Sequence, residues 1–210
     1  MRRIVLLSLL LSVIPLQTNA APKDDALTVL NSLAVKGRAA KTGYTREQFP
    51  TWSDLNHNGC DTRNEILNRD LTQVLFKAGT KDCKVTSGSL LDPYSGKVIT
   101  FSSTKSTIDI DHVVALSNAW QTGAAYFDKT KRQLIANDPL NLLAVDYSLN
   151  RQKGDGDAAT WLPPLKTYRC DYVARQIAVK AKYALWVTSP EKVAIVNILE
   201  KCVGQKIPIS

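Results

Sequence analysis

Residues 109–155 contain the three segments that decide the fold: 109-DIDHVVAL-116, 137-NDPLNLLAVD-146 and 148-SLNRQKGD-155. The first segment alternates acids with β-branched and aliphatic residues, which is typical of a strand. The second contains the apolar run 142–145 and predicts another strand. The third is polar and basic and can begin a short helix. One imidazole and several oxygen side chains in the order strand, strand, helix predict a site for a hard divalent ion such as Mg²⁺.

The flanking sequence predicts further helices and a hairpin. Apolar residues at helical spacing favour a helix over 26–35 and another from 62 to about 76, with Leu67, Leu71, Val74 and Leu75 on its buried side. The runs 84–91 and 97–102, joined by the turn-rich 92–96, are typical of paired strands. Helices are also expected between Leu116 and Asn137, over 171–187 and over 190–202.

The N-terminal residues 1–20 have the features of a secretory signal. Arg2 and Arg3 precede the apolar run 4–16, and small residues end the segment before Ala21. The run is too short for a membrane-spanning helix. We therefore expect an extracellular protein that has no membrane contact once the signal is removed.

Export makes the four cysteines candidates for disulfides. Three pairings are possible. We predict Cys60 with Cys83 and Cys170 with Cys202, because each pair brackets one predicted helix and closes a short loop. A zinc site with four cysteine ligands is the alternative, although the sequence contains no CxxC motif.

The balance of charges suits a polyanionic partner. The chain carries +8, and removal of Arg2 and Arg3 with the signal leaves +6. Such an excess favours nucleic acid. A basic exported protein with no such partner is the alternative.

Residues 54–65 fit the calcium-loop pattern D-x-N-x-N-G-x₅-E, whose ligands would be Asp54, Asn56, Asn58 and Glu65. A structural alternative uses Glu65 in a different way. The segment 62-TRNE-65 is a capping box, in which the Glu65 carboxylate would accept a hydrogen bond from a backbone N–H group. Of the two, we favour a turn followed by a capped helix; the other would be a second, structural site that binds Ca²⁺.

The motif DIDHVVA, followed by NLLAVDYSLNRQKGD, resembles the ββα-metal motif of HNH endonucleases. The nuclease domain of RNA-guided CRISPR enzymes is similar, including the nine-residue separation of Asn141 and Asn150. The wider run 136–164 resembles small secreted bacterial proteins of the HNH type, over about 52–202. The resemblance implies an α+β fold with a ββα-metal (HNH) core, surrounding helices and a β-hairpin. The domains would be a signal peptide (1–20), an N-terminal helix and arm (21–50) and a nuclease domain (51–210).

The resemblance also implies the roles of the site residues. His112 would be the general base, with Asp111 and Asn150 as ligands of Mg²⁺ or Mn²⁺. Asn141 would hold the loop that carries the base, and Asp109 would orient His112 or lie behind the ligands. Contacts to nucleic acid are expected from Arg63, Arg151 and Lys153.

These residues imply a secreted, metal-dependent HNH endonuclease, a monomer that hydrolyses DNA, or RNA, with low sequence specificity. Two other functions are compatible with the sequence. One is a non-catalytic extracellular module that binds nucleic acid, and the other is a calcium-stabilised protein of the cell envelope. The presence of Asp111, His112 and Asn150 together favours the enzyme.

Overall fold

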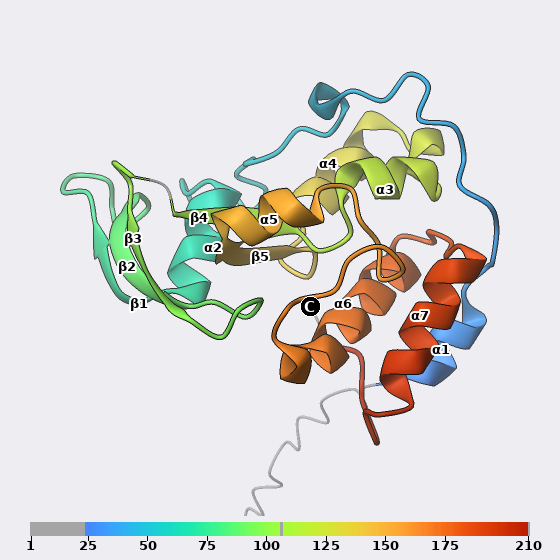
Figure 1. The fold of residues 1–210 in the computed structure, drawn as a ribbon. Helices are drawn as coiled ribbons and strands as arrows, with labels where there is room; N and C mark the ends of the chain where they lie inside the picture. The colour runs from blue at the N-terminus through green and yellow to red at the C-terminus, as the bar shows by residue number, and fades with distance from the viewer. Residues whose placement is uncertain (1–23, 106, 210) are drawn as a thin grey trace, which may run out of the picture.

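The computed structural model describes residues 24–105 and 107–209, and the predicted signal peptide lies outside them. The chain folds into two small antiparallel sheets surrounded by helices (Figure 1). The elements, in chain order, are α1 (Ala26–Ser32), η1 (Arg46–Gln48), α2 (Thr62–Asp70), β1 (Thr72–Phe76), β2 (Val85–Leu91), β3 (Val98–Ser102), β4 (Ile108–His112), α3 (Leu116–Gln121), η2 (Ala124–Tyr126), α4 (Lys129–Asn137), β5 (Leu142–Asp146), α5 (Tyr147–Lys153), η3 (Lys166–Tyr168), α6 (Arg169–Lys182) and α7 (Ser189–Leu199). This is the mixed α+β class that the sequence predicted.

The strand, strand, helix order predicted for 109–155 is confirmed. β4 and β5 pair antiparallel, with Ile108 opposite Asp146 and His112 opposite Leu142. α5 follows β5 directly, because the Asp146 carboxylate accepts a hydrogen bond from the Leu149 N–H group at 2.9 Å and caps the helix. The connection from β4 to β5 contains α3 and α4, as expected.

The second sheet has the order β1-β2-β3, and the predicted hairpin forms its β2-β3 part. The helix predicted from 62 to about 76 was wrong in its second half. α2 ends at Asp70, and 72–76 form β1, which pairs with β2. Gln73 has a left-handed φ of 52° and Leu75 is exposed, so neither continues a helix. The β-branched and aromatic side chains of β1 pair with β2, and this pairing outweighs their helical spacing.

α2 is also capped differently from the prediction. Its N-cap is Asp61, whose carboxylate accepts a hydrogen bond from the Asn64 N–H group at 2.8 Å. Thr62 is the first residue of the helix itself, and its hydroxyl donates to the Ser53 carbonyl. Glu65 accepts hydrogen bonds from the side chains of Asn56 and Asn58. The predicted capping box was therefore wrong, because the N-cap is Asp61, one position before Thr62.

The two predicted disulfides are present, Cys60–Cys83 and Cys170–Cys202. The first joins the 54–65 loop to the segment that enters β2. The second joins the start of α6 to the chain just after α7. Each bridge therefore fixes the position of a helix end.

α6 is the central helix of the C-terminal half, where α1 and α7 pack against it (Figure 1). It ends at Lys182, earlier than predicted, because Ala184 adopts a left-handed φ of 54°. α7 begins after Thr188, which forms a capping box with Glu191. Buried side chains of α1, α6 and α7 pack into one hydrophobic core with those of β5.

Candidate active site

A polar cavity of about 470 Å³ lies over β4, beside α5 and beneath the segment that links α1 to α2. Its lining brings together residues from four separate parts of the chain, which are Tyr44, Arg46, Trp52, Arg63, Asp109, Ile110, Asp111, His112, Ala115, Leu116, Asn150, Arg151, Gly154 and Asp155. Six of the eight site residues that the HNH resemblance implies are in this set, and the four residues of the possible calcium loop are not. Asn141 and Lys153 are the two of the eight that lie outside it.

His112 ends β4 and is 4 % exposed. Its Nε2 atom lies 2.9 Å from the carbonyl oxygen of Ala136, in the last turn of α4. Because a carbonyl oxygen only accepts, Nε2 carries the proton and Nδ1 keeps a lone pair. Burial lowers the pKa of His112 to about 3, with a further contribution from the positive charge of Arg46. The imidazole is therefore neutral at pH 7, the form that can accept a proton.

Asn141 is fully buried and holds the chain that follows His112. Its Oδ1 atom accepts a hydrogen bond from the Val114 N–H group at 2.8 Å, and its backbone carbonyl accepts one from Val113 at 2.8 Å. Its Nδ2 atom donates to the carbonyls of Val114 and Ile135, both at 3.3 Å. Asn141 therefore positions the turn after β4, and its burial keeps it out of contact with a substrate.

Asp109 on β4 and Asn150 on α5 are neighbours in the lining of the cavity. The Asn150 amide nitrogen donates to the Asp109 carboxylate at 3.1 Å, and both side chains are half-buried. This contact uses one oxygen of Asp109 and the nitrogen of Asn150. A carboxylate oxygen and an amide oxygen are left, which are the donors that Mg²⁺ and Mn²⁺ prefer.

Asp111 lies on the same side of β4 as Asp109 but deeper. Its Oδ1 atom lies 2.8 Å from the ammonium of Lys153, and its Oδ2 atom accepts a hydrogen bond from the Tyr94 hydroxyl at 2.5 Å. Burial raises the pKa of the Asp111 carboxyl, while Lys153 and Tyr94 oppose that shift. Both carboxylate oxygens are therefore already engaged inside the protein.

The sequence predicted that Lys153 is a cation available to nucleic acid, but the structure places it in the interior. Its side chain is fully buried, and its ammonium contacts Asp111 and the backbone carbonyl of His112, each at 2.8 Å. A buried lysine needs such partners to remain charged. This pairing takes the ammonium away from the surface, which argues against the phosphate contact predicted at Lys153.

Arg63 and Arg151 do lie at the cavity, as predicted, and a third arginine joins them. Arg63 packs near the ring of Phe101, and Arg151 lies over the ring of Tyr147. Arg46, at the start of η1, is exposed. Among residues 24–105 and 107–209, none of these three guanidinium groups is in an ion pair with a carboxylate. Their charges are available to an anion in the cavity.

The contribution of Tyr44, Arg46 and Trp52 was not predicted from the sequence. These residues belong to the segment 41–52, named the arm below, which crosses above α3 and α4 before it reaches α2 (Figure 1). The Trp52 ring lies 6.0 Å from the ring of His112, centroid to centroid. The arm has no motif of its own, so only its mixture of cations and aromatic residues could have suggested a binding role.

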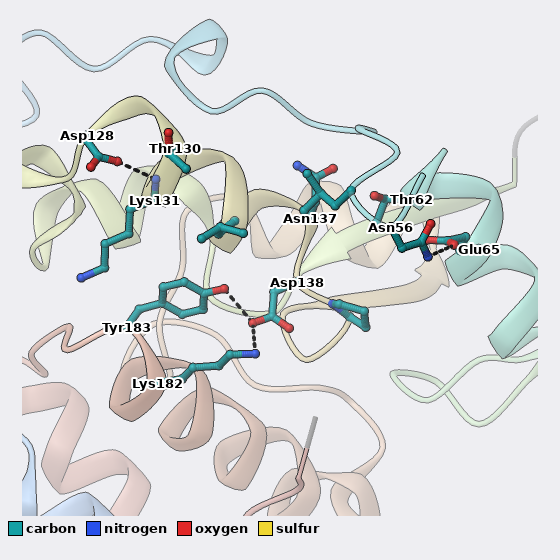
Figure 2. A pocket seen from close by; sticks show the side chains of 13 residues that line it. Asn56, Thr62, Glu65, Asp128, Thr130, Lys131, Asn137, Asp138, Lys182 and Tyr183 are labelled. Atoms are coloured by element: carbon teal, nitrogen blue, oxygen red, sulfur yellow. Dashed lines mark hydrogen bonds and ion pairs between the residues drawn. The ribbon is translucent and has the colours of Figure 1, made fainter. Parts of the chain in front are cut away.

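A larger cleft of about 670 Å³ lies on the other side of α4 (Figure 2). At its floor the Asp138 carboxylate accepts a hydrogen bond from the Tyr183 hydroxyl at 2.8 Å and pairs with Lys182 at 2.7 Å. Glu65 lies at its edge, with the Asn56 side chain donating to it (Figure 2). This cleft lacks the imidazole and the grouped guanidinium charges of the smaller cavity, so we place the chemistry in the latter.

The described residues contain no group of three or more His, Cys, Asp or Glu side chains that could hold a metal ion. A site built on Asp109 and Asn150 would not form such a group, since one of its donors is an amide. The 54–65 loop contains three carboxylates, Asp54, Asp61 and Glu65. Asp61 caps α2, and Asp54 accepts hydrogen bonds from the N–H groups of Asn58 and Gly59. The calcium site at this loop stays a prediction.

The comparisons with known proteins place the chain in a class of nucleases. Residues 61–198 match the family of GmrSD restriction endonucleases, C-terminal domain, and the chain belongs to that family. It is also similar to an uncharacterized secreted protein of the fungus Arthroderma benhamiae, at 40% identity over 191 residues, which are 90% of each chain. No solved structure matches.

The protein is secreted, as the sequence predicted and as its relative is described. Within the part of the chain that the structure describes, no helix is long and apolar enough to cross a membrane.

Proposed function

We propose that the protein is a secreted, metal-dependent endonuclease with a ββα-metal (HNH) core formed by β4, β5 and α5. The observation that carries this proposal is the hydrogen bond of His112 to Ala136, which leaves a neutral imidazole with one unprotonated nitrogen at a cavity bordered by three guanidinium groups. Membership of a nuclease family supports the same function. The finer points, namely the metal, the DNA substrate and the roles of single residues, are part of the proposal.

The donor set fits a divalent ion. Asp109 and Asn150 would hold it, because they are adjacent at the cavity and each retains an oxygen donor. Asp111, the ligand implied by the resemblance, is tied to Lys153 and Tyr94, so we assign it to hold Lys153 beneath the site. A bound divalent ion would supply neutralisation of charge on the phosphate and on the departing oxygen.

The chain's own residues would act on water and phosphate. Nδ1 of His112 accepts a proton from a water molecule, whose oxygen attacks phosphorus as the bond to the 3′-oxygen breaks. Asn141 keeps His112 in place through the turn at Val113 and Val114. Arg63 and Arg151 bind non-bridging oxygens of the phosphate backbone, which carry no sequence information. Low sequence specificity follows.

The direct test incubates the purified protein with plasmid DNA and with RNA, in Mg²⁺, in Mn²⁺ and in EDTA. We expect strand cleavage that requires a divalent ion and is lost in EDTA. Binding without cleavage in any metal would instead support the non-catalytic nucleic-acid-binding module. If the protein neither binds nor cleaves nucleic acid, a nucleic acid substrate is rejected, and the calcium-stabilised envelope protein is the function that is left.

A separate test addresses the ligand assignment. Isothermal titration with Mn²⁺ reports binding without any turnover. We expect Asp109→Asn and Asn150→Ala to weaken Mn²⁺ binding, and Asp111→Asn to affect mainly the free energy of unfolding. Loss of Mn²⁺ binding in Asp111→Asn, with normal binding in Asp109→Asn, would restore Asp111 as the ligand.

A further inference from the structure

The arm is outside the residues that match the nuclease family, yet it closes one side of the cavity. The family match begins at residue 61, whereas Tyr44, Arg46 and Trp52 all line the cavity with His112. The arm is held at both ends. Lys41 pairs with Asp155 at 2.7 Å, and the Trp52–Ser53 end is fixed to α4. These side chains therefore belong to the site although they lie outside the matched residues.

Trp52 is held in an unfavourable backbone conformation. Its φ is 61°, a left-handed value that non-glycine residues rarely adopt. Asn137 imposes it from both sides, because its Nδ2 atom donates to the Pro50 carbonyl at 2.7 Å and its Oδ1 atom accepts from the Ser53 N–H group at 2.8 Å. Strain that the surroundings maintain in this way is typical of functional positions. Its result here is a half-buried indole ring at the cavity, beside His112.

Arg46 complements this ring. It is exposed, lines the same cavity and has no carboxylate partner among the described residues. The neighbouring Tyr44 anchors η1 by packing against Phe49 and Trp120, at centroid distances of 6.1 and 5.9 Å. The arm therefore presents an aromatic ring and a guanidinium group on a fixed support.

We propose that the arm binds an unpaired nucleotide next to the scissile phosphate, with its base stacked on Trp52 and its phosphate bound by Arg46. This inference rests on the proposed nuclease function. An aromatic ring and a cation side by side are how proteins bind single-stranded nucleic acid. A base inside a duplex has neighbours on both of its faces, so it reaches such a ring only when it leaves the stack. The substrate class is therefore single-stranded nucleic acid, or duplexes with unpaired nucleotides.

The binding test does not depend on cleavage. Wild-type protein in EDTA is titrated with a 12-nucleotide single strand, and both tryptophan fluorescence and the anisotropy of a labelled strand are followed. We expect quenching that disappears in Trp52→Phe, while anisotropy still reports binding. Trp186→Phe is the matched control, since Trp186 is half-buried outside the cavity and should leave the quenching intact. Parallel titrations with DNA and RNA strands compare the two sugars.

The cleavage test compares one sequence as a single strand and as a duplex. We expect faster cleavage of the single strand, and a loss of about 10-fold or more in Trp52→Ala, on the scale of one lost base stack. Trp52→Phe should retain most activity. Arg46→Gln should flatten the dependence of binding on salt by about one unit, whereas Lys129→Gln, an exposed cation outside the cavity, should change it less.

The two proposals fail differently. Quenching that depends on Trp52, without cleavage in any metal, would reject the nuclease and keep the nucleotide site. Equal cleavage of both substrates, with Trp52→Ala and Arg46→Gln no worse than the Trp186→Phe and Lys129→Gln controls, would reject the nucleotide site and keep the nuclease.

Discussion

The ammonium of Lys153 and the carboxylate of Asp111 form a buried ion pair, 2.8 Å apart, directly beneath the candidate active site. The pair joins α5 to β4, two elements of the proposed catalytic core. The Tyr94 hydroxyl, from the connection between β2 and β3, donates to the same carboxylate. Three separate segments thus meet at one charge.

We predict that Lys153→Met lowers the free energy of unfolding by about 3–5 kcal/mol, because it leaves a buried carboxylate without its partner. Lys41→Met is the control, since its pair with Asp155 is exposed and should contribute about 1 kcal/mol or less. Urea denaturation measures both. Equal effects of the two substitutions would contradict a structural role for the buried pair.

His112→Ala should lower the turnover rate by roughly 100-fold or more, the usual scale for loss of a general base. Cleavage of plasmid DNA at saturating substrate measures it, and circular dichroism checks the fold. His57→Ala should be mild by comparison, because His57 is exposed and outside the cavity. Full activity of His112→Ala would remove the HNH assignment.

Each disulfide should contribute on the order of 3 kcal/mol, from the chain-entropy model for loops of this size. The bridges span 23 and 32 residues. Paired Cys→Ser substitutions, made one bridge at a time, should each lower the melting temperature. Peptide mapping without reduction checks the pairing itself, and a linked fragment containing Cys60 and Cys202 would contradict it.

Arg151→Gln should reduce the slope of log affinity against log salt by about one unit, because each phosphate contact releases counterions on binding. The measurement uses His112→Ala protein with single strands of equal length and unrelated sequence, and with the matching duplexes. Lys153 cannot contribute to this slope from its buried position. A strong preference for one short sequence would argue against low specificity.

The 54–65 loop gives a separate prediction about calcium. If Asp54 and Glu65 bind Ca²⁺ with the asparagines between them, millimolar Ca²⁺ raises the melting temperature and Glu65→Gln abolishes the increase. Mg²⁺ at the same concentration is the control for general ionic effects. No shift with Ca²⁺ would leave the loop as a hydrogen-bonded turn.

Much of the fold followed from local patterns. β4, β5 and α5 were predicted because alternating and apolar runs can be recognised within a few residues. The disulfides were predicted because the two cysteines of each pair are close in sequence. β1 was missed because Val74 and Leu75 lie three and four residues after Leu71, which is also the spacing of one face of a helix. The pairing with β2 decides between a strand and a helix here, and this pairing cannot be read from residues 72–76 alone.

The site was predicted less completely, since its contacts are between distant residues. The resemblance supplied His112, Asp109 and Asn150, but not the burial of Lys153, whose partner is 42 positions away. Nor could it supply Trp52, which reaches His112 only through the path of the arm. Lysine is normally exposed, so the basic pattern of α5 gave no sign that one member is internal.

The last turn of α4 carries both the acceptor for His112, at Ala136, and the clamp for Trp52, at Asn137. Successive residues of a helix are rotated by about 100°, as follows from 3.6 residues per turn. Insertion of one residue just before Ala136 would therefore turn both groups away together. The C-terminal end of the connection between β4 and β5 must therefore keep its register.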